Sequence, residues 1–164
     1  QPCAVLGVLV HLDVRILVCV VTEAKKDASS RDGMAKSAQI SPYYEAWLAS
    51  APRNFAEMKA ALAAGDLARV GELTEASTLA MHACAMAAGV IYVRGITLDL
   101  IARVRQLRAG GAAAWSTSDA GPHVKVLVAT KDAPAVRAVL EATPGVVRVI
   151  EARPGPGPRV VEAG

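Results

Sequence analysis

Aromatic side chains are scarce in this sequence, whose 164 residues include one Phe, two Trp and three Tyr. Its 18 basic residues barely outnumber the 15 acidic ones, and they are scattered along the chain instead of forming a stripe. Proteins that bind single-stranded nucleic acid combine basic grooves with aromatic stacking platforms. We therefore expect no nucleic-acid partner, whereas a net charge of +3 is compatible with small anionic ligands.

Cysteine is also rare. The three cysteines, Cys3, Cys19 and Cys84, are odd in number and lack the spacing of a metal-binding set. They are most simply explained as reduced thiols of a cytoplasmic protein. No metal site made of side chains is expected.

The longest apolar run is interrupted by charge. It extends from Cys3 to Thr22, with His11, Asp13 and Arg15 near its middle. Each charge costs roughly 2.5 to 3.5 kcal/mol at the centre of a membrane helix, and no basic segment precedes the run as it would in a signal peptide. We expect neither a membrane span nor a secretory leader.

The common phosphate-binding loops are missing as well. The sequence has no G-x-x-x-x-G-K-[ST], and no G-x-G-x-x-G that follows a strand. The tract from Pro154 to Pro158 contains glycines, but its prolines have no backbone N–H with which to bind phosphate. The chain therefore lacks the usual phosphate cradle for ATP.

What is present predicts one α+β domain. β-Branched and aliphatic residues at 14–21 predict a strand buried on both faces, whereas residues 23–39 have too few apolar side chains for an element with a core face. Helices are expected from Ser41–Pro42, from Pro52 to Gly65, from Asp66 to Ala88, from Thr97 to Gly110 and at 132–142, and further strands at about 113–118, 123–129 and 146–152. This order predicts a ferredoxin-like sandwich, an antiparallel sheet covered by helices on one face.

The most informative stretch is a predicted hairpin near residue 119. Val124, Val126 and Val128 alternate with other residues as in a half-buried strand, and Asp119-Ala-Gly-Pro122 before them is typical of a tight turn. Loops on rigid strands often carry functional groups, which makes Asp119 a candidate site residue. The alternative is that its carboxylate only stabilises the turn, by bonding the backbone two residues further on.

A second candidate site lies at residues 25–34, Lys-Lys-Asp-Ala-Ser-Ser-Arg-Asp-Gly-Met. Lysines, hydroxyls and a guanidinium within ten residues can bind phosphate oxygens from a loop. The alternative is a solvated surface loop, which composition alone favours. His82 lies among alanines in a predicted helix, where packing is favoured over a role as a ligand.

Four stretches, in order and spacing, resemble the diphosphomevalonate decarboxylases of the GHMP kinase superfamily. They are Glu23–Met34 with the following Ser41–Trp47, Glu72–Ala83, Asp119–Leu127 with Trp115 before it, and Gly155–Pro158. The resemblance covers residues 13–160 and only the C-terminal half of that family. Two departures are His123, where relatives usually carry Asn, and Ser116-Thr-Ser118, where an aromatic residue is usually followed by Thr-Met.

The resemblance implies an enzyme that uses ATP and Mg2+ to convert mevalonate 5-diphosphate to isopentenyl diphosphate, CO2, ADP and phosphate in the mevalonate pathway. It implies a GHMP-type C-terminal domain over residues 13–164, with residues 1–12 a remnant of the connection to a missing N-terminal half. In the relatives that half carries the Ser-rich glycine loop that binds ATP, so we expect this chain alone to be inactive. Family members are commonly homodimers, which makes a homodimer the corresponding expectation.

The resemblance also implies roles for individual residues. Asp119 would orient the 3-hydroxyl of the substrate and accept its proton, and Ser30 would hydrogen-bond the phosphoryl group in transfer. The residues that would bind the substrate are Arg31, Met34, Lys25 and Lys26.

Two alternatives remain open. Within the same family, the protein could be a mevalonate 3-kinase or a phosphomevalonate decarboxylase. From a different class, it could be a non-catalytic ferredoxin-like module that binds a small anion or a partner. An enzyme is favoured if Asp119 and Ser30 open into the same cleft, and a module if they lie far apart.

Overall fold

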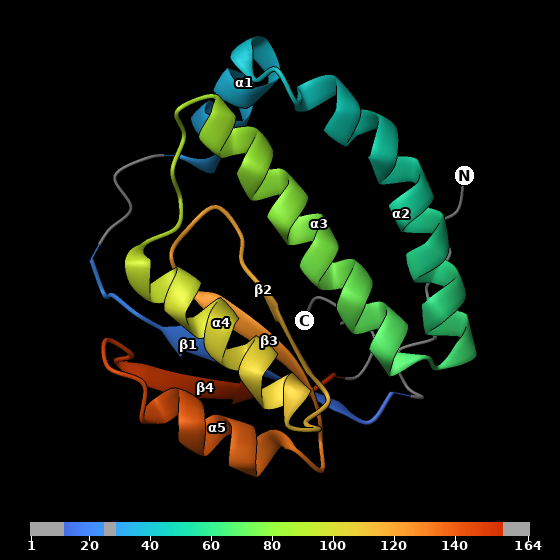
Figure 1. Ribbon diagram of the computed structural model, residues 1–164, viewed down its shortest axis with the longest axis vertical. Helices are drawn as coiled ribbons and strands as arrows, with labels where there is room; N and C mark the ends of the chain where they lie inside the picture. The colour runs from blue at the N-terminus through green and yellow to red at the C-terminus, as the bar shows by residue number, and fades with distance from the viewer. Residues whose placement is uncertain (1–11, 25–28, 156–164) are drawn as a thin grey trace, which may run out of the picture.

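A computed structural model describes residues 12–24 and 29–155, and its centre is an antiparallel sheet with the strand order β2-β3-β1-β4 (Figure 1). The strands are β1 (Val14–Val20), β2 (Ala114–Thr117), β3 (Val124–Ala129) and β4 (Arg148–Ala152). The helices are α1 (Ser30–Ile40), α2 (Tyr44–Ala64), α3 (Leu67–Ala87), α4 (Gly95–Ala109) and α5 (Ala133–Glu141). Along the chain, one strand is followed by helices, a β-hairpin, a helix and a last strand. This chain order and the strand order of the sheet confirm the predicted ferredoxin-like α+β fold.

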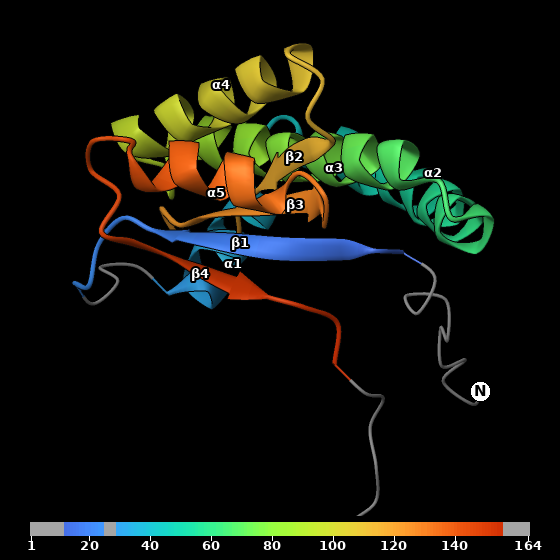
Figure 2. The ribbon, with the colours of Figure 1, turned by 90° about the horizontal axis from the view of Figure 1, so that it is seen from below.

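Alternate side chains of the central strands enter two different cores. Leu17 of β1 and Val126 of β3 are register partners, and both are fully buried against α4 and α5, which lie together on one side of the sheet (Figure 2). Ile16 and Leu127, the next pair, face the opposite way and pack with residues of α2 and α3 such as Leu73. The helical cover thus extends beyond the single face that the sequence predicted.

Helix α1 occupies a segment in which no packed element was expected, so that interpretation was wrong. Ser29 caps the helix, since its hydroxyl accepts hydrogen bonds from the backbone N–H groups of Arg31 and Asp32 at 3.2 and 3.4 Å. The buried residues of α1 are Gly33 and Ser37. Because the buried face is made of small residues, a search for apolar periodicity does not detect it.

Helix α2 is continuous where two helices were predicted, since Pro52 lies inside it and does not end it. Proline leaves one helical carbonyl without a partner, but Pro52 and Leu48 are both exposed, so water can solvate that carbonyl. The helix begins at Tyr44, whereas Ser41 was the expected cap. Phe55 was expected on the core face and is 63% exposed.

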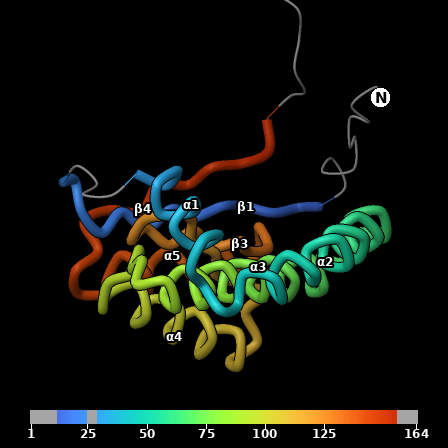
Figure 3. The backbone as a smooth tube through the Cα atoms, turned by 90° about the horizontal axis from the view of Figure 1, so that it is seen from above, coloured from blue at the N-terminus to red at the C-terminus, as the bar shows by residue number. Residues whose placement is uncertain are grey.

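The remaining elements lie close to their predicted ranges. Asp66 precedes α3 and accepts a hydrogen bond from the N–H of Arg69 at 3.0 Å, and α3 runs side by side with α2 (Figures 1 and 3). Thr97 was expected to open α4 and instead occupies its first turn, where its hydroxyl accepts a hydrogen bond from the N–H of Arg94 at 3.0 Å. Within the described residues, no helix has the length and apolar character needed to cross a membrane.

Candidate functional site

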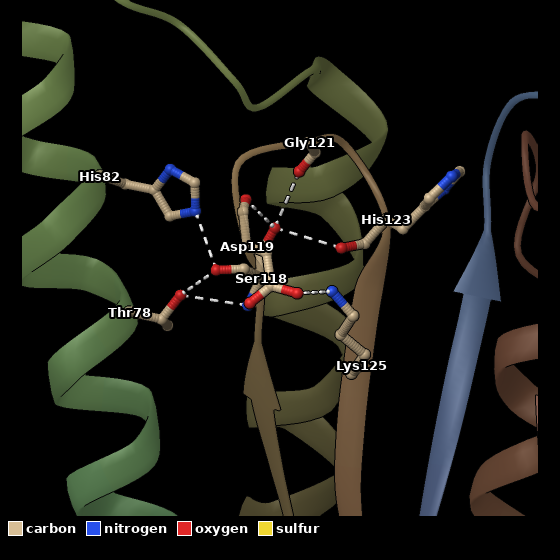
Figure 4. Close-up of polar contacts among 7 residues, drawn as sticks. All are labelled: Thr78, His82, Ser118, Asp119, Gly121, His123 and Lys125. Carbon is tan, nitrogen blue, oxygen red and sulfur yellow. Dashed lines mark hydrogen bonds and ion pairs between the residues drawn. The ribbon is translucent and has the colours of Figure 1, made fainter. Parts of the chain in front are cut away.

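The loop that joins β2 to β3, Ser118–His123, is bonded to α3 at its first residue (Figure 4). The hydroxyl of Thr78 accepts a hydrogen bond from the N–H of Ser118 at 3.1 Å and donates one to its carbonyl oxygen at 2.6 Å. His82, one helical turn further along α3, places its Nε2 3.2 Å from the same carbonyl. Since a carbonyl oxygen only accepts, Nε2 carries the proton.

Four further contacts hold the rest of this loop, which we call the Asp119 loop. The Ser118 hydroxyl lies within hydrogen-bonding distance of the carbonyls of Gly121 and His123, at 3.0 and 3.1 Å (Figure 4). Thr97 of α4 donates to the carbonyl of Pro122 at 2.9 Å, and the imidazole Nδ1 of His123 accepts from the backbone N–H of Val21 at 3.3 Å. The loop is therefore attached to α3, α4 and the residue after β1.

The carboxylate of Asp119 projects away from these contacts. Its side chain is 79% exposed and forms an ion pair with the ammonium group of Lys125 on β3 (Figure 4). Thr117 is the register partner of Lys125, so the hairpin brings the lysine beside the turn. The carboxylate does not bond the turn backbone through any contact seen in the described structure, and the expectation that it only stabilises the turn is not supported there.

Lys125 and Thr78 were missed by sequence reasoning. The signal for Lys125 lay in the predicted hairpin, because the alternation of Val124 and Val126 places the intervening lysine on the opposite face of β3. Thr78 gave no such signal, since its role depends on the contact between α3 and the loop.

His82 is a buried residue that is also bonded to the candidate site. Only 5% of it is exposed, and burial lowers the pKa of its imidazole from the usual value, against the smaller opposing effects of the Ser118 hydrogen bond and the charge of Asp119. The ring meets Tyr92 edge to face at 6.2 Å between centroids. Its Nδ1 is buried and has no hydrogen-bond partner among the described residues. The packing interpretation is thus incomplete, because the ring also contacts the Asp119 loop.

The second candidate site lies at the start of α1. Ser30 and Arg31 are exposed in the first turn of the helix, and Met34 is half-buried on the next. The positive end of a helix dipole favours anions, and the hydroxyl of Ser30 and the guanidinium of Arg31 are donors that suit phosphate oxygens, which agrees with the predicted affinity of this segment for phosphate. The two lysines of the prediction, Lys25 and Lys26, lie outside the described residues.

Tyr92 contacts both candidate sites. Its hydroxyl lies 3.5 Å from the carbonyl oxygen of Ser30. Tyr92 also belongs to a small apolar cluster with Ala85, Ala88 and Val90, against which Ala120 of the Asp119 loop packs. The start of α1 and the Asp119 loop are therefore attached to the same cluster.

Two of the hollows on the described part of the chain lie beside α2. A groove of about 360 Å³ is lined by Asp119 and by Trp47, Met58, Thr74, Ser77, Thr78, Met81, Thr117 and Ser118. A larger one, about 740 Å³, lies between α2 and α3 and does not include Asp119. Ser30 is not among the residues that line either of these two hollows. The same part of the chain contains no cluster of His, Cys, Asp and Glu that could hold a metal ion.

In a comparison with known protein families, residues 16–151 match the family described as "Mevalonate 5-diphosphate decarboxylase C-terminal domain". Comparison with the curated proteins by sequence gives no match. Among solved structures, a protein named MDDEF, in complex with MVAPP, is 32% identical with a TM-score of 0.84, over 93% of this chain and 48% of that one.

Two further structures agree with this. The mevalonate pyrophosphate decarboxylase of Streptococcus pyogenes is 32% identical with a TM-score of 0.82, over 91% of this chain and 47% of that one. The mevalonate diphosphate decarboxylase of Enterococcus faecalis is 32% identical with a TM-score of 0.78, over 90% and 44%. This chain spans about half the length of each of these proteins. The family match covers most of the chain, and the resemblance seen in the sequence is confirmed: the protein belongs to the mevalonate 5-diphosphate decarboxylase C-terminal domain family.

Proposed function

We propose that this chain is the C-terminal part of an ATP-dependent decarboxylase that converts mevalonate 5-diphosphate to isopentenyl diphosphate, CO2, ADP and phosphate. The chain belongs to this family, and the observation that carries the proposal is where its structure places the carboxylate of Asp119. Its carboxylate is exposed on a loop that is bonded through its backbone to two helices and through the His123 imidazole to the residue after β1. An exposed carboxylate on a rigid support is suited to accept a proton from a bound substrate.

In this proposal Asp119 acts first. The 3-hydroxyl oxygen of the substrate forms a bond to the terminal phosphorus of ATP, the bond to ADP breaks, and the hydroxyl proton passes to Asp119. The new phosphate then leaves with its bonding electrons while the C–C bond to the carboxylate breaks, giving CO2 and the alkene. Lys125 keeps the carboxylate of Asp119 oriented through their ion pair.

The start of α1 has the complementary role of binding phosphate. Ser30 donates a hydrogen bond to the phosphoryl group in transfer, and Arg31 neutralises the diphosphate. Met34 lines the site, while Lys25 and Lys26 add positive charge from the segment before the helix. Exposure of Ser30 and Arg31 in the first helical turn supports these assignments.

ATP and Mg2+ are the proposed cofactors. One similar protein was solved with MVAPP, AMPPCP and magnesium. The described residues of this chain offer hydroxyl and guanidinium donors, which suit phosphate oxygens, and no carboxylate cluster that would suit a cation. Mg2+ would therefore be held mainly by phosphate oxygens and water, and would neutralise their charge.

We also propose that a second protein segment completes the site. The similar solved proteins are about twice as long as this chain, and the groove that Asp119 lines does not include Ser30 among its lining residues. A surface that faces both would close the cleft and supply the ATP loop. The chain by itself is then expected to release no CO2.

The test is ATP-dependent CO2 release by this chain supplied with the remaining half of the enzyme, as one polypeptide or as two. Asp119→Asn should lower kcat by about 10² to 10⁴, the usual contribution of a general base. Asp66→Asn is the matched control, because asparagine is an equally good helix cap. If Asp119→Asn kept more than a tenth of the activity, the assignment of the base would be wrong. Mevalonate and its monophosphate, run in parallel, test the 3-kinase and phosphomevalonate decarboxylase alternatives.

A further inference from the structure

His82 and Thr78 bond the same peptide group, the one that leads into Asp119. The carbonyl of Ser118 and the N–H of Asp119 belong to one planar unit. Two donors, 2.6 and 3.2 Å from that carbonyl oxygen, approach it from successive turns of α3. Because they hold the orientation of the peptide plane, they also limit the directions in which the Asp119 side chain can leave the backbone.

The His82 ring also contacts Tyr92, a residue that reaches the second candidate site. The ring meets Tyr92 edge to face, and the hydroxyl of Tyr92 lies 3.5 Å from the carbonyl of Ser30. Gly33 lies so close to Tyr92 that a Cβ at that position would come within 2.8 Å of the ring carbon Cζ. His82 therefore contacts both the peptide before Asp119, which it faces in Figure 4, and Tyr92, the residue against which α1 packs.

Packing alone does not account for a histidine at this position. A leucine would fill a similar volume without burying an Nδ1 that has no partner among the described residues. The Ser118 carbonyl already accepts a hydrogen bond from Thr78. It therefore does not need His82 to be satisfied, and the His82 contact is a second hydrogen bond to the same oxygen. Burial also lowers the pKa of His82, which keeps the ring uncharged.

We propose that His82 is a positioning residue for the decarboxylation: its Nε2–H orients the Ser118–Asp119 peptide, and its ring supports Tyr92 beneath the start of α1. This inference rests on the proposed function, because it assigns His82 to the groups that would act on the substrate. His82 itself need not touch substrate. A misplacement of about 1 Å in such groups can cost about 10²-fold in rate.

Two substitutions separate the hydrogen bond from the packing. His82→Leu keeps an apolar side chain and removes the donor, whereas His82→Gln restores an N–H donor to the Ser118 carbonyl. In the enzyme completed with its other half, His82→Leu should lower kcat about 10- to 100-fold with little change in KM, and His82→Gln should recover most of the loss. Val136→Ala, a fully buried residue of α5 on the other core, is the control for destabilisation alone.

A purely structural role for His82 makes a different prediction. In that case His82→Leu and Val136→Ala, compared well below their unfolding temperatures, both keep wild-type kcat, and that result would overturn the proposal. Failure of glutamine to rescue kcat would also overturn it. In combination with Asp119→Asn, His82→Leu should cause little further loss, because both act through the same carboxylate.

A spectroscopic measurement on the 164-residue chain keeps this test independent of the proposed function. The nitrogen chemical shifts of the imidazole should show a neutral ring protonated at Nε2, and the amide signal of Asp119 should move in His82→Leu and return in His82→Gln. If wild-type enzyme releases no CO2 while these signals behave as expected, the proposed reaction fails and the positioning of Asp119 stands. If the Asp119 signal does not respond to His82, the positioning role fails whatever the reaction.

Discussion

Replacing Gly33 by alanine should lower activity far more than stability. Gly33 lies on the buried face of α1, one turn after Ser30. An added Cβ would overlap the Tyr92 hydroxyl and lie 2.8 Å from Tyr92 Cζ and 3.0 Å from Val90 Cγ1. Since carbon atoms pack at about 3.5 to 4.0 Å, the start of α1 must shift by about 1 Å.

The expected magnitudes follow from two opposing effects on stability. Overpacking costs about 1 to 3 kcal/mol, and the higher helix propensity of alanine returns up to about 1 kcal/mol. The free energy of unfolding of Gly33→Ala should therefore fall by about 0 to 3 kcal/mol, as measured by urea denaturation of the chain. A shift of about 1 Å at Ser30 should reduce kcat about 10²-fold in the completed enzyme.

Two further variants test the cause. A methyl group added at Gly95, the first residue of α4, would meet no atom within 4 Å, so Gly95→Ala should keep full activity. Tyr92→Phe in the Gly33→Ala background removes the atom of closest overlap and should recover part of the activity. The reasoning fails if Gly33→Ala retains at least half of the wild-type kcat, because α1 would then not be held against Tyr92.

Three other predictions concern buried groups. Glu75→Gln should lower the free energy of unfolding by about 1 to 3 kcal/mol, because the buried carboxylate of Glu75 bonds two arginines of α4 and a serine of β2; a change below about 0.5 kcal/mol would contradict this. Burial lowers the pKa of His82 below its usual 6.5, so as the pH falls the imidazole is protonated in the unfolded chain before it is protonated in the folded one. Stability should then be full above about pH 6.5 and decline as the pH falls below it, and this part of the slope should vanish in His82→Gln; an unchanged slope would refute it. Burial raises the pKa of the Cys19 thiol to about 12, and Cys84 is also buried, so in a Cys3→Ser variant a thiol reagent at about pH 8 should react only as fast as the protein unfolds, and immediate reaction would refute it.

Local pattern was sufficient for most of the fold. The unbroken aliphatic run of β1 predicts a central strand, and the alternating valines of β3 predict a strand of a hairpin. Both signals arise because buried apolar residues recur along the sequence with the period of the helix or strand that they belong to. It was insufficient for α1 and α2. The buried face of α1 consists of Gly33 and Ser37, which carry no apolar signal, and Pro52 is tolerated in α2 because the helix is exposed there.

The sequence by itself determined the α+β fold, the family and the candidate residues Asp119, Ser30 and Arg31, because these depend on periodicity and on motifs contiguous in the chain. Only the tertiary structure decided which groups support Asp119. Thr78 and His82 lie 40 and 36 residues before the Ser118 carbonyl that they bond, and Lys125 meets the carboxylate only because the hairpin closes. Such contacts depend on the packing of separate elements, and no local pattern of residues encodes that packing.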